Sequence, residues 1–410
     1  MGELSGHVVI RSGPVRGSPF DRITRLACVK DFVPTRHAIH VLPEGELERK
    51  LEQGRPLRVK LGVDPTSPDV HLGFAVVLDR LREWQDAGHT VVLIVGDYTA
   101  RIGDPSGRSS ERPVLADEVL DANAEHFAGQ AFRILDPART EIRRNGEWLA
   151  VLSFAEVVRL TRILTVARLL ERDDFAKRFD AREPISLSEL LYPPMQAYDS
   201  VAVEADVEIG GTDQLYNLLT GRDVMERYGL EPQVVVTYPL LVGVDGVEKM
   251  SKSKGNYIGI TEPPEEMFGK TMSIPDGALA QWWELAAGGG EHPVDPMEWK
   301  LALARAIVGR WHGEEGARAG EEHFTRVVRR HEAPAEVPDA MFAADGAPVY
   351  LPAVLQSVFG QSASHWRRQI DQGGVKVNGE TPQGYELAPE ALDGALVQAG
   401  KRQFVRLHLA

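Results

Sequence analysis

The chain has 410 residues, 43% of them hydrophobic, and a formal net charge of −14 at pH 7. This length predicts about two or three domains, and no apolar run reaches the roughly eighteen residues that a membrane-spanning helix needs. The single cysteine, Cys28, excludes an internal disulfide and a zinc site built on paired cysteines, which points to a reducing cytoplasm. The acidic total does not exclude a nucleic-acid partner, because RNA needs only a local basic surface.

Residues 1–36 carry several arginines and no long apolar segment, and we interpret them as an N-terminal extension, not a secretory signal. Residues 57–62 predict a strand, which the two X-Pro pairs that follow end in a turn. Beyond the turn, apolar residues over 74–84 recur at helical spacing, and residues 90–96 predict a buried parallel strand. His71 is therefore expected at a strand-to-helix crossover, where a helix N-terminus can hold an anion.

The pattern of residues 37–230 alternates strand-like and helical segments. This alternation predicts an α/β fold with a Rossmann-like, doubly wound parallel sheet. Within it, residues 152–179 predict one long helical stretch that belongs to a connecting insertion. Residues 231–262 carry the last strand and a lysine-rich loop, so we expect the first domain to span residues 37–262.

The lysine-rich loop reads Glu-Lys-Met-Ser-Lys-Ser-Lys-Gly-Asn over residues 248–256. It carries Lys249, Lys252 and Lys254 directly after an apolar run. A lysine is a compact charge on a flexible stem, which suits the transient stabilisation of phosphate oxygens. The loop therefore predicts a polyanionic ligand that is bound and released.

Residues 263–331 predict a helical domain, and residues 332–349, rich in Ala, Pro and acidic residues, are interpreted as a linker. The buried helical face is expected to consist of Met297, Leu301, Ala304, Ile307, Val308 and Trp311. Residues 350–410 predict a small α+β module. Its expected parts are a helix over 351–359, a basic helix over 364–370 and a strand that enters a turn at Asn378-Gly379.

The segment His71-Leu72-Gly73-Phe74 and the lysine-rich loop resemble the HIGH and KMSKS motifs of class I aminoacyl-tRNA synthetases. Residues 103–108, 192–199 and 209–214 narrow the resemblance to the tyrosyl-tRNA synthetase family. The bacterial form of that family ends in a small RNA-binding domain named after a ribosomal small-subunit protein, which residues 350–410 resemble. Five motifs in the right order make the resemblance specific, and it covers residues 37–410.

This resemblance implies an enzyme that activates L-tyrosine with ATP and Mg²⁺, releases pyrophosphate and transfers tyrosine to the 3′-terminal adenosine of its tRNA. It also implies a cytoplasmic homodimer, with the insertion at the dimer surface and residues 263–331 on the anticodon side. No structural metal and no membrane partner are expected. The residues expected to bind tRNA are Arg367, Arg368, Lys376 and Arg402.

In amino-acid activation, positioning and charge stabilisation are expected to dominate, because the phosphoryl-type substitution leaves little covalent work to the protein. His71, Lys249 and Lys252 are the expected catalytic residues. The resemblance implies ATP contacts at Gly62, Asp64, Thr66, His71, Gly73, Gly210, Asp213, Lys249, Met250 and Lys252. Further phosphate contacts are expected from Arg108, Arg112 and Lys254.

The resemblance implies tyrosine contacts at Asp64, Asp104, Tyr192, Gln196, Asp199 and Gln214. On a helix, Tyr192, Gln196 and Asp199 share one face. Asp199 would accept a hydrogen bond from the phenol hydroxyl, and phenylalanine would leave that buried carboxylate unpaired.

Two positions depart from the family pattern. Phe74 replaces the second histidine of the HIGH motif and cannot form that residue's hydrogen bond to the nucleotide. Lys60 stands where many bacterial members place a tyrosine that also contacts the phenol hydroxyl.

Two other functions fit parts of the sequence. A tryptophanyl-tRNA synthetase shares the architecture and the lysine-rich loop, although the segments 192–199 and 210–214 favour tyrosine. A catalytically silent RNA-binding paralogue would explain Phe74 but not the complete lysine-rich loop.

Overall fold

The computed structural model describes residues 35–106, 115–329, 337–344, 346–400 and 403–410. Several residues named above lie outside this description, namely Cys28, Arg108, Arg112, Arg402 and all of the N-terminal extension except residues 35 and 36. The chain divides into two compact units. The first comprises the described residues up to Thr261 together with Pro275–Gly290, and the second comprises Glu262–Ile274 and the described residues from Glu291 onward.

The first unit is built on a sheet with the strand order β1-β6-β5-β2-β3-β4. These strands are β1 (His40–Leu42), β2 (Arg58–Val63), β3 (Thr90–Val95), β4 (Thr140–Arg144), β5 (Val207–Gly211) and β6 (Val234–Tyr238). All neighbouring pairs are parallel except β1 with β6. The order reverses between β2 and β5, which confirms the predicted doubly wound sheet and places its switch point there.

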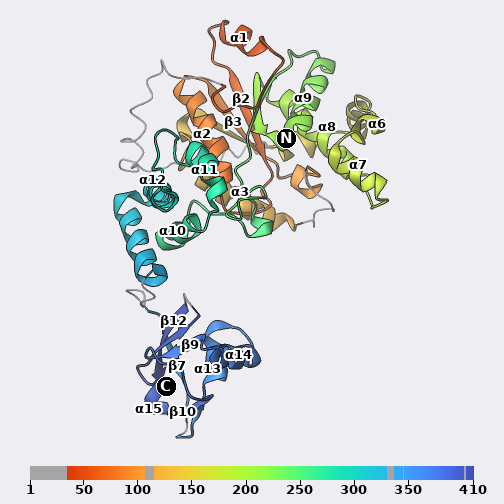
Figure 1. The fold of residues 1–410 in the computed structure, drawn as a ribbon. Coiled ribbons are helices and arrows are strands. Elements are labelled where there is room, and N and C mark those ends of the chain that lie inside the picture. The colour runs from red at the N-terminus through yellow and green to blue at the C-terminus, as the bar shows by residue number, and fades with distance from the viewer. Residues whose placement is uncertain (1–34, 107–114, 330–336, 345, 401–402) are drawn as a thin grey trace, which may run out of the picture. The chain divides into compact units, whose positions relative to one another are not determined.

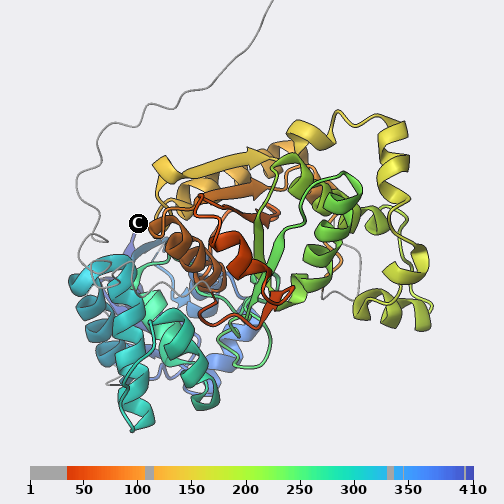
Figure 2. The ribbon, with the colours of Figure 1, turned by 90° about the horizontal axis from the view of Figure 1, so that it is seen from above.

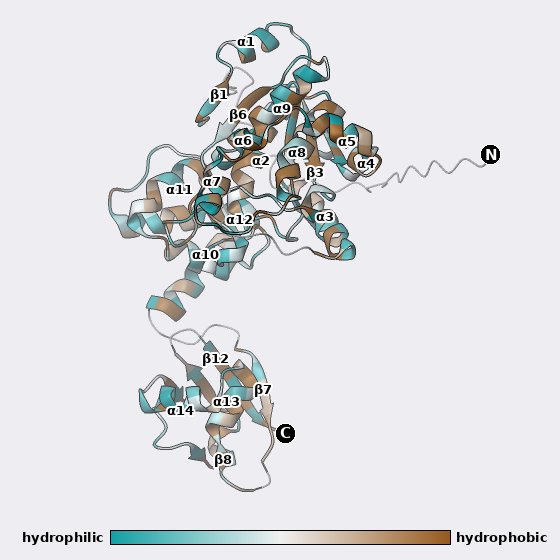
Figure 3. Ribbon diagram, turned by 90° about the vertical axis from the view of Figure 1, so that its right-hand side faces the viewer, coloured by the Kyte–Doolittle hydropathy of each residue, from teal (hydrophilic) through white to brown (hydrophobic). Residues whose placement is uncertain are grey.

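Helices cover both faces of this sheet, with α2 and α9 on opposite sides (Figure 1). The helices of the first unit are α1 (Glu46–Leu51), α2 (Leu72–Asp86), α3 (Asp117–Ala131), α4 (Gly146–Leu149), α5 (Phe154–Thr161), α6 (Val166–Leu169), α7 (Asp173–Asp180), α8 (Tyr192–Ala202), α9 (Leu215–Arg227) and α11 (Leu279–Ala286). The strand β3 is apolar and buried along residues 91–95, and Figure 3 shows it brown. Such a run is typical of a strand covered on both faces.

The insertion differs from its prediction. Residues 152–179 form three short helices, α5, α6 and α7, instead of one long stretch. Ser153 and Glu156 form a capping box at the start of α5, and the Thr165 hydroxyl caps α6. Each cap begins a new helix, so the apolar periodicity of the segment is real but is divided. Figure 2 shows these helices, in yellow, standing away from the sheet.

The second unit contains α10 (Pro264–Met272), which packs against α12 (Pro296–Phe324). Five of the six expected core residues on α12 are buried: Leu301, Ala304, Ile307, Val308 and Trp311. The prediction for Met297 is wrong, because this side chain is 45% exposed in the first turn of the helix. Residues 275–290, which we expected in the helical domain, belong to the first unit, where α11 packs against α2.

The rest of the second unit is the small α+β module. Its elements are β7 (Asp339–Phe342), β8 (Val349–Tyr350), α13 (Leu351–Phe359), α14 (Ala363–Asp371), β9 (Val375–Val377), β10 (Glu386–Leu387), α15 (Pro389–Leu392), β11 (Leu396–Ala399) and β12 (Gln403–Leu409). The expected turn is present, with φ of 51° at Asn378 and 88° at Gly379. Both values are positive, as a type I′ hairpin turn requires.

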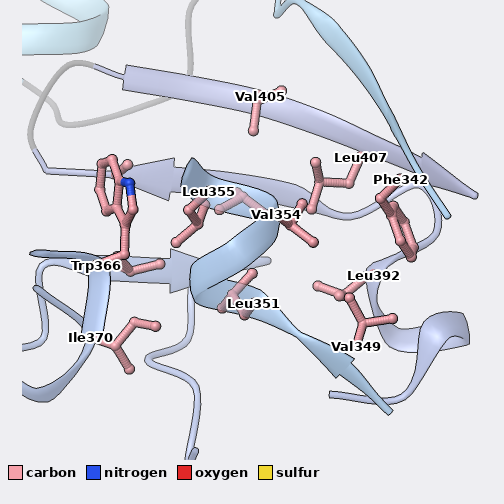
Figure 4. Close-up of a cluster of buried hydrophobic side chains, with 13 residues drawn as sticks. Phe342, Val349, Leu351, Val354, Leu355, Trp366, Ile370, Leu392, Val405 and Leu407 are labelled. Carbon is pink, nitrogen blue, oxygen red and sulfur yellow. The ribbon is translucent and has the colours of Figure 1, made fainter. Parts of the chain in front are cut away.

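Part of the expected linker is a strand. Within residues 332–349, β7 pairs in parallel with β12, and Phe342 is buried in the module's apolar cluster (Figure 4). The short segment Asp-Ala-Met-Phe lacks a recognisable alternation, and only the pairing with a strand 67 residues later (Asp339 with Arg406) makes it a strand. None of the helices in the described parts of the chain is long and apolar enough to cross a membrane.

Candidate functional site

The expected site residues gather at the carboxyl ends of β2 and β5, beside the switch point of the sheet. Asp64 directly follows β2, whereas Gly210 and Gly211 end β5 and Asp213 follows them. Ligands of doubly wound folds bind in the crevice outside this edge, because the loops diverge there. Gly62 is the second-last residue of β2 and so lies near the same edge.

Hydrogen bonds join the start of α2 to the lysine-rich loop and to the segment that directly follows the loop. The Leu72 amide donates to the Ile258 carbonyl (2.9 Å), and the Ile260 amide donates to the Val70 carbonyl (2.9 Å). The Gly73 amide donates to Met250 Sδ at 3.3 Å. The structure therefore places the lysine-rich loop directly against the start of α2.

His71 precedes the first turn of α2 and is 8% exposed. Its ring lies 4.6 Å from the Phe74 ring, and its Nδ1 is buried without a hydrogen-bond partner among the described residues. Burial, helped by the charge of Lys252, lowers the pKa of His71 to about 3. The imidazole is therefore neutral at pH 7, and it can act on phosphate as a hydrogen-bond donor but not as a cation.

Gly73 allows this packing. A Cβ at Gly73 would lie 3.1 Å from the His71 ring, which is tighter than most such contacts. Phe74 also packs edge-on against Phe127, with ring centroids 5.8 Å apart. The residue that departs from the HIGH motif is thus held in an aromatic cluster.

Each lysine of the loop has a protein partner. Lys249 Nζ lies 2.6 Å from Asp213 Oδ2, Lys252 donates to the Asp69 carbonyl, and Lys254 pairs with Glu248. Lys249 and Asp213, both expected to contact ATP, therefore contact each other. Burial lowers the pKa of Lys252 to about 8, although the charge of Asp69 opposes this shift.

The helix α8 carries three of the residues expected to bind the amino acid, namely Tyr192, Gln196 and Asp199. Tyr192 donates its hydroxyl to Asp64 Oδ2 at 3.0 Å. Gln196 is 9% exposed, and its Oε1 is buried with no hydrogen-bond partner in the described chain. A buried acceptor of this kind normally has a partner, so a donor such as an ammonium group would satisfy it.

Asp199, one turn further along α8, is 2% exposed. Its Oδ1 accepts from Trp148 Nε1 at 2.8 Å, and its Oδ2 accepts from Asn145 Nδ2 at 3.3 Å. Burial raises the pKa of Asp199 to about 7, against the opposing effects of the Lys60 charge and these two donors. Two hydrogen bonds leave a carboxylate with further acceptor sites.

Asp64 is fixed from two sides. Besides Tyr192, it accepts from the Thr99 hydroxyl at 2.8 Å. A Cβ at Gly96 would overlap Asp64 Oδ1, so only glycine fits beside it. The Thr66 amide donates to the Asp64 carbonyl at 2.8 Å, which places Thr66 on the same crossover loop.

Asp104 and Gln214 contact each other directly, because Gln214 Nε2 donates to Asp104 Oδ2 at 2.8 Å. The Ser106 amide donates to the other carboxylate oxygen at 2.9 Å. The six residues expected to bind tyrosine thus form two groups in the structure. One group lies around Asp64 and α8, and the other lies around Asp104.

Several residues that support the site carried no motif in the sequence: Thr99, Asn145, Trp148, Arg172 and Asn217. Asn145 donates both to Thr99 and to Asp199, so it joins the two carboxylates that the sequence predicted. Its position directly after β4 was the available signal, because polar residues at the carboxyl end of a parallel strand face the ligand edge.

Lys60 is completely buried and does not lie free in the pocket. Its Nζ is 2.9 Å from Glu208 Oε1 and donates to Ser200 Oγ at 2.6 Å. Lys60, at the position where the resemblance implies a tyrosine, thus forms an internal ion pair with Glu208 and a hydrogen bond to α8.

The residues expected to bind tRNA belong to the second unit. Arg367 and Arg368 are exposed on α14, and Lys376 is exposed on β9. All three are exposed cations of the small α+β module.

Residues 52–328 match the family model of class I tRNA synthetases (W and Y). The chain is 47% identical to a tyrosine–tRNA ligase of Moorella thermoacetica, over 91% of this chain and 94% of the relative. It is 48% identical to a tyrosine–tRNA ligase of Thermotoga maritima, over 91% and 95%. A crystal structure of tyrosyl-tRNA synthetase complexed with L-tyrosine from Archaeoglobus fulgidus superposes with a TM-score of 0.56 at 25% identity, over 70% of this chain and 96% of that chain.

Proposed function

The chain belongs to the class I tRNA synthetases of the tryptophan and tyrosine family, and we propose that it is a tyrosine–tRNA ligase. It activates L-tyrosine with MgATP to tyrosyl-adenylate and pyrophosphate, and then transfers tyrosine to the 3′-terminal adenosine of its tRNA. The polar face of α8 is the observation that carries this proposal. It combines a buried amide oxygen at Gln196, which has no hydrogen-bond partner among the described residues, with a buried carboxylate at Asp199.

The proposed ATP site lies between the start of α2 and the lysine-rich loop. Neutral His71 donates to a phosphate oxygen, and Lys252 supplies a charge that grows in importance as pyrophosphate departs. When nucleotide enters, Lys249 exchanges Asp213 for phosphate, and Asp213 becomes free to accept from a ribose hydroxyl. Gly62, Gly73, Gly210 and Met250 line the same crevice, with Thr66 and Lys254 near the phosphates.

The proposed tyrosine site places the ammonium group between Gln196, Tyr192 and Asp104. Asp199 accepts a hydrogen bond from the phenol hydroxyl, while Trp148 and Asn145 hold the carboxylate in place. Phenylalanine would remove water from this carboxylate without replacing its hydrogen bond, at a cost of about 1–3 kcal/mol.

The proposed macromolecular partners are tRNA and a second copy of the chain, in the cytoplasm where tRNA is charged. The basic surface of α14 and β9 suits tRNA phosphates. The insertion exposes Phe154 (82%), Val166 (58%) and Phe179 (60%), and a second copy that covered these side chains would remove their apolar surface from water. Phe154→Asp should therefore lower the mass of the particle in sedimentation equilibrium, whereas an unchanged mass would contradict this interface.

The test of the proposed function is ATP–pyrophosphate exchange by the purified chain. We expect exchange that depends on tyrosine and is not supported by tryptophan or phenylalanine at equal concentration. Exchange with tryptophan would assign the chain to the other branch of its family. A folded protein without exchange would support a catalytically silent RNA-binding role, for which the Phe74 substitution would then be the explanation.

A further inference from the structure

Arg172 is a buried cation outside the residues that the sequence assigned to the site. It lies between α6 and α7 in the insertion, and its side chain is 5% exposed. Asp174 pairs with it at 2.7 Å, and its guanidinium carbon lies 5.2 and 5.1 Å from the Phe175 and Tyr216 ring centroids. The ion pair and the two aromatic faces fix the guanidinium in one position.

The remaining hydrogen bonds of Arg172 connect it to residues next to Asp104 and Gln214, two of the residues expected to bind tyrosine. Its Nη1 donates to Asn217 Oδ1 at 2.7 Å, and its Nη2 donates to Ser106 Oγ at 3.0 Å. Asn217 Nδ2 donates to Gln214 Oε1 at 3.0 Å, and Gln214 Nε2 donates to Asp104 Oδ2 at 2.8 Å. The Ser106 amide donates to Asp104 Oδ1, which closes a ring of hydrogen bonds. We refer to Arg172, Asn217, Gln214, Asp104 and Ser106 as the Arg172 network.

The guanidinium sets the orientation of the two side-chain amides in this ring. Arginine carries donors only, so Asn217 must turn its oxygen toward Arg172 and its Nδ2 toward Gln214. Gln214 must then present its oxygen to Asn217 and its Nε2 to Asp104. If Gln214 were reversed, an amide oxygen would face the carboxylate.

We propose that Arg172 is a positioning residue for amino-acid binding, which acts through the amides of Asn217 and Gln214 to orient the Asp104 carboxylate toward the substrate ammonium group. This inference rests on the proposed function, because it requires Asp104 to bind that group. Arg172 itself does not contact the substrate. It connects the insertion to the amino-acid pocket, so the position of the insertion affects tyrosine affinity.

The planar fork of donors, and not the charge alone, explains why arginine is needed. A lysine at residue 172 could neutralise Asp174, but it lacks the planar fork that donates to Asn217 and Ser106 together. A purely structural ion pair would tolerate this change, whereas the Arg172 network would not.

The decisive variant is Asn217→Asp, compared with wild type in tyrosine-dependent ATP–pyrophosphate exchange. The new carboxylate accepts from Arg172 even more strongly, which favours the folded protein, but it has no donor for Gln214. Gln214 would reverse and turn its oxygen toward Asp104. We expect KM for tyrosine to rise about tenfold, equivalent to about 1.4 kcal/mol, with kcat at saturating tyrosine and KM for ATP within about twofold of wild type.

Arg172→Lys should raise KM for tyrosine in the same way, and it decides the matter if Asn217→Asp does not fold. Arg168→Gln is the matched control, because Arg168 is a partly exposed arginine of the same insertion that pairs with Asp223 outside the network. Unchanged KM for tyrosine in a folded Asn217→Asp protein, or in Arg172→Lys when only that variant folds, would overturn the proposal. Absence of tyrosine-dependent exchange in wild type would instead reject the proposed function.

Discussion

Asp199 illustrates how burial can create selectivity from a single side chain. The carboxylate is almost completely removed from water and is held by Trp148 and Asn145. The two donors fix its direction but do not exhaust its capacity to accept. A ligand hydroxyl is therefore favoured, and a ligand without one leaves the desolvation of the carboxylate uncompensated.

The Asp199→Ala variant should lose activity with tyrosine while retaining or gaining activity with phenylalanine. The measurement is the ratio of kcat/KM for the two amino acids in pyrophosphate exchange. We expect about 1–3 kcal/mol of discrimination to disappear, the usual cost of an unsatisfied buried group. Asp86→Ala, at a partly exposed carboxylate of α2, is the control. An unchanged ratio in folded Asp199→Ala would show that this carboxylate only supports the pocket.

The pKa shifts at the site predict the limits of the pH profile. With the pKa of Asp199 raised to about 7, its ionised form is lost as pH falls below that value, so kcat/KM for tyrosine should decline on the acid side. The charged groups that act on it are Lys60, which favours ionisation, and Glu208, which opposes it. Asp199→Asn should remove this acid limb, and persistence of the limb in that variant would assign it to another group.

Lys252 sets the corresponding limit on the alkaline side. Its pKa of about 8 means that its positive charge is lost as pH rises beyond this value, and kcat/KM for ATP should decline there.

Lys252→Ala should lower the single-turnover rate of adenylate formation by roughly one to three orders of magnitude, as expected for a lost transition-state donor. A rate equal to wild type would exclude a catalytic role for this lysine.

At the scale of elements, the α/β alternation and the strand-to-helix crossover at His71 could be predicted, because their apolar periodicity is local. The polar face of α8 was also predictable, because the helical spacing that brings Tyr192, Gln196 and Asp199 together is local. The hydrogen bonds from Asn145 and Trp148 to Asp199 were not, because they join residues 54 and 51 positions apart. The connections of the Arg172 network could not be predicted because its members come from three separate segments, and β7 could not because its strand partner lies 67 residues later.

Because β7 pairs with β12, we expect the small α+β module to be removable only together with β7. A truncation that deletes residues 337–410 removes β7 together with the sheet it joins. It should leave tyrosine-dependent exchange nearly intact and raise KM for tRNA. A truncation after residue 349 leaves Phe342 without its apolar cluster, and this protein should aggregate more readily in static light scattering. Equal solubility of the two truncations would contradict the assignment of β7 to the tail.

On the scale of the whole molecule, the chain combines a unit that carries the candidate site with a second unit that carries the small α+β module. The first unit contains every described residue proposed to contact ATP or tyrosine, whereas Arg367, Arg368 and Lys376 belong to the second. Phosphate contacts are screened by salt, so the contribution of the tail to tRNA affinity should weaken as ionic strength rises. Adenylation has no such contacts in the second unit and should be less sensitive.

The central claim is that this chain charges tRNA with tyrosine, and the most direct measurement is aminoacylation by the purified full-length protein. Total bacterial tRNA is incubated with MgATP and labelled tyrosine, tryptophan or phenylalanine, and acid-precipitable label is followed over time. We predict that tyrosine alone is attached, through an ester bond that mild base hydrolyses. Attachment of tryptophan in place of tyrosine, or no attachment by a folded protein, would contradict the account.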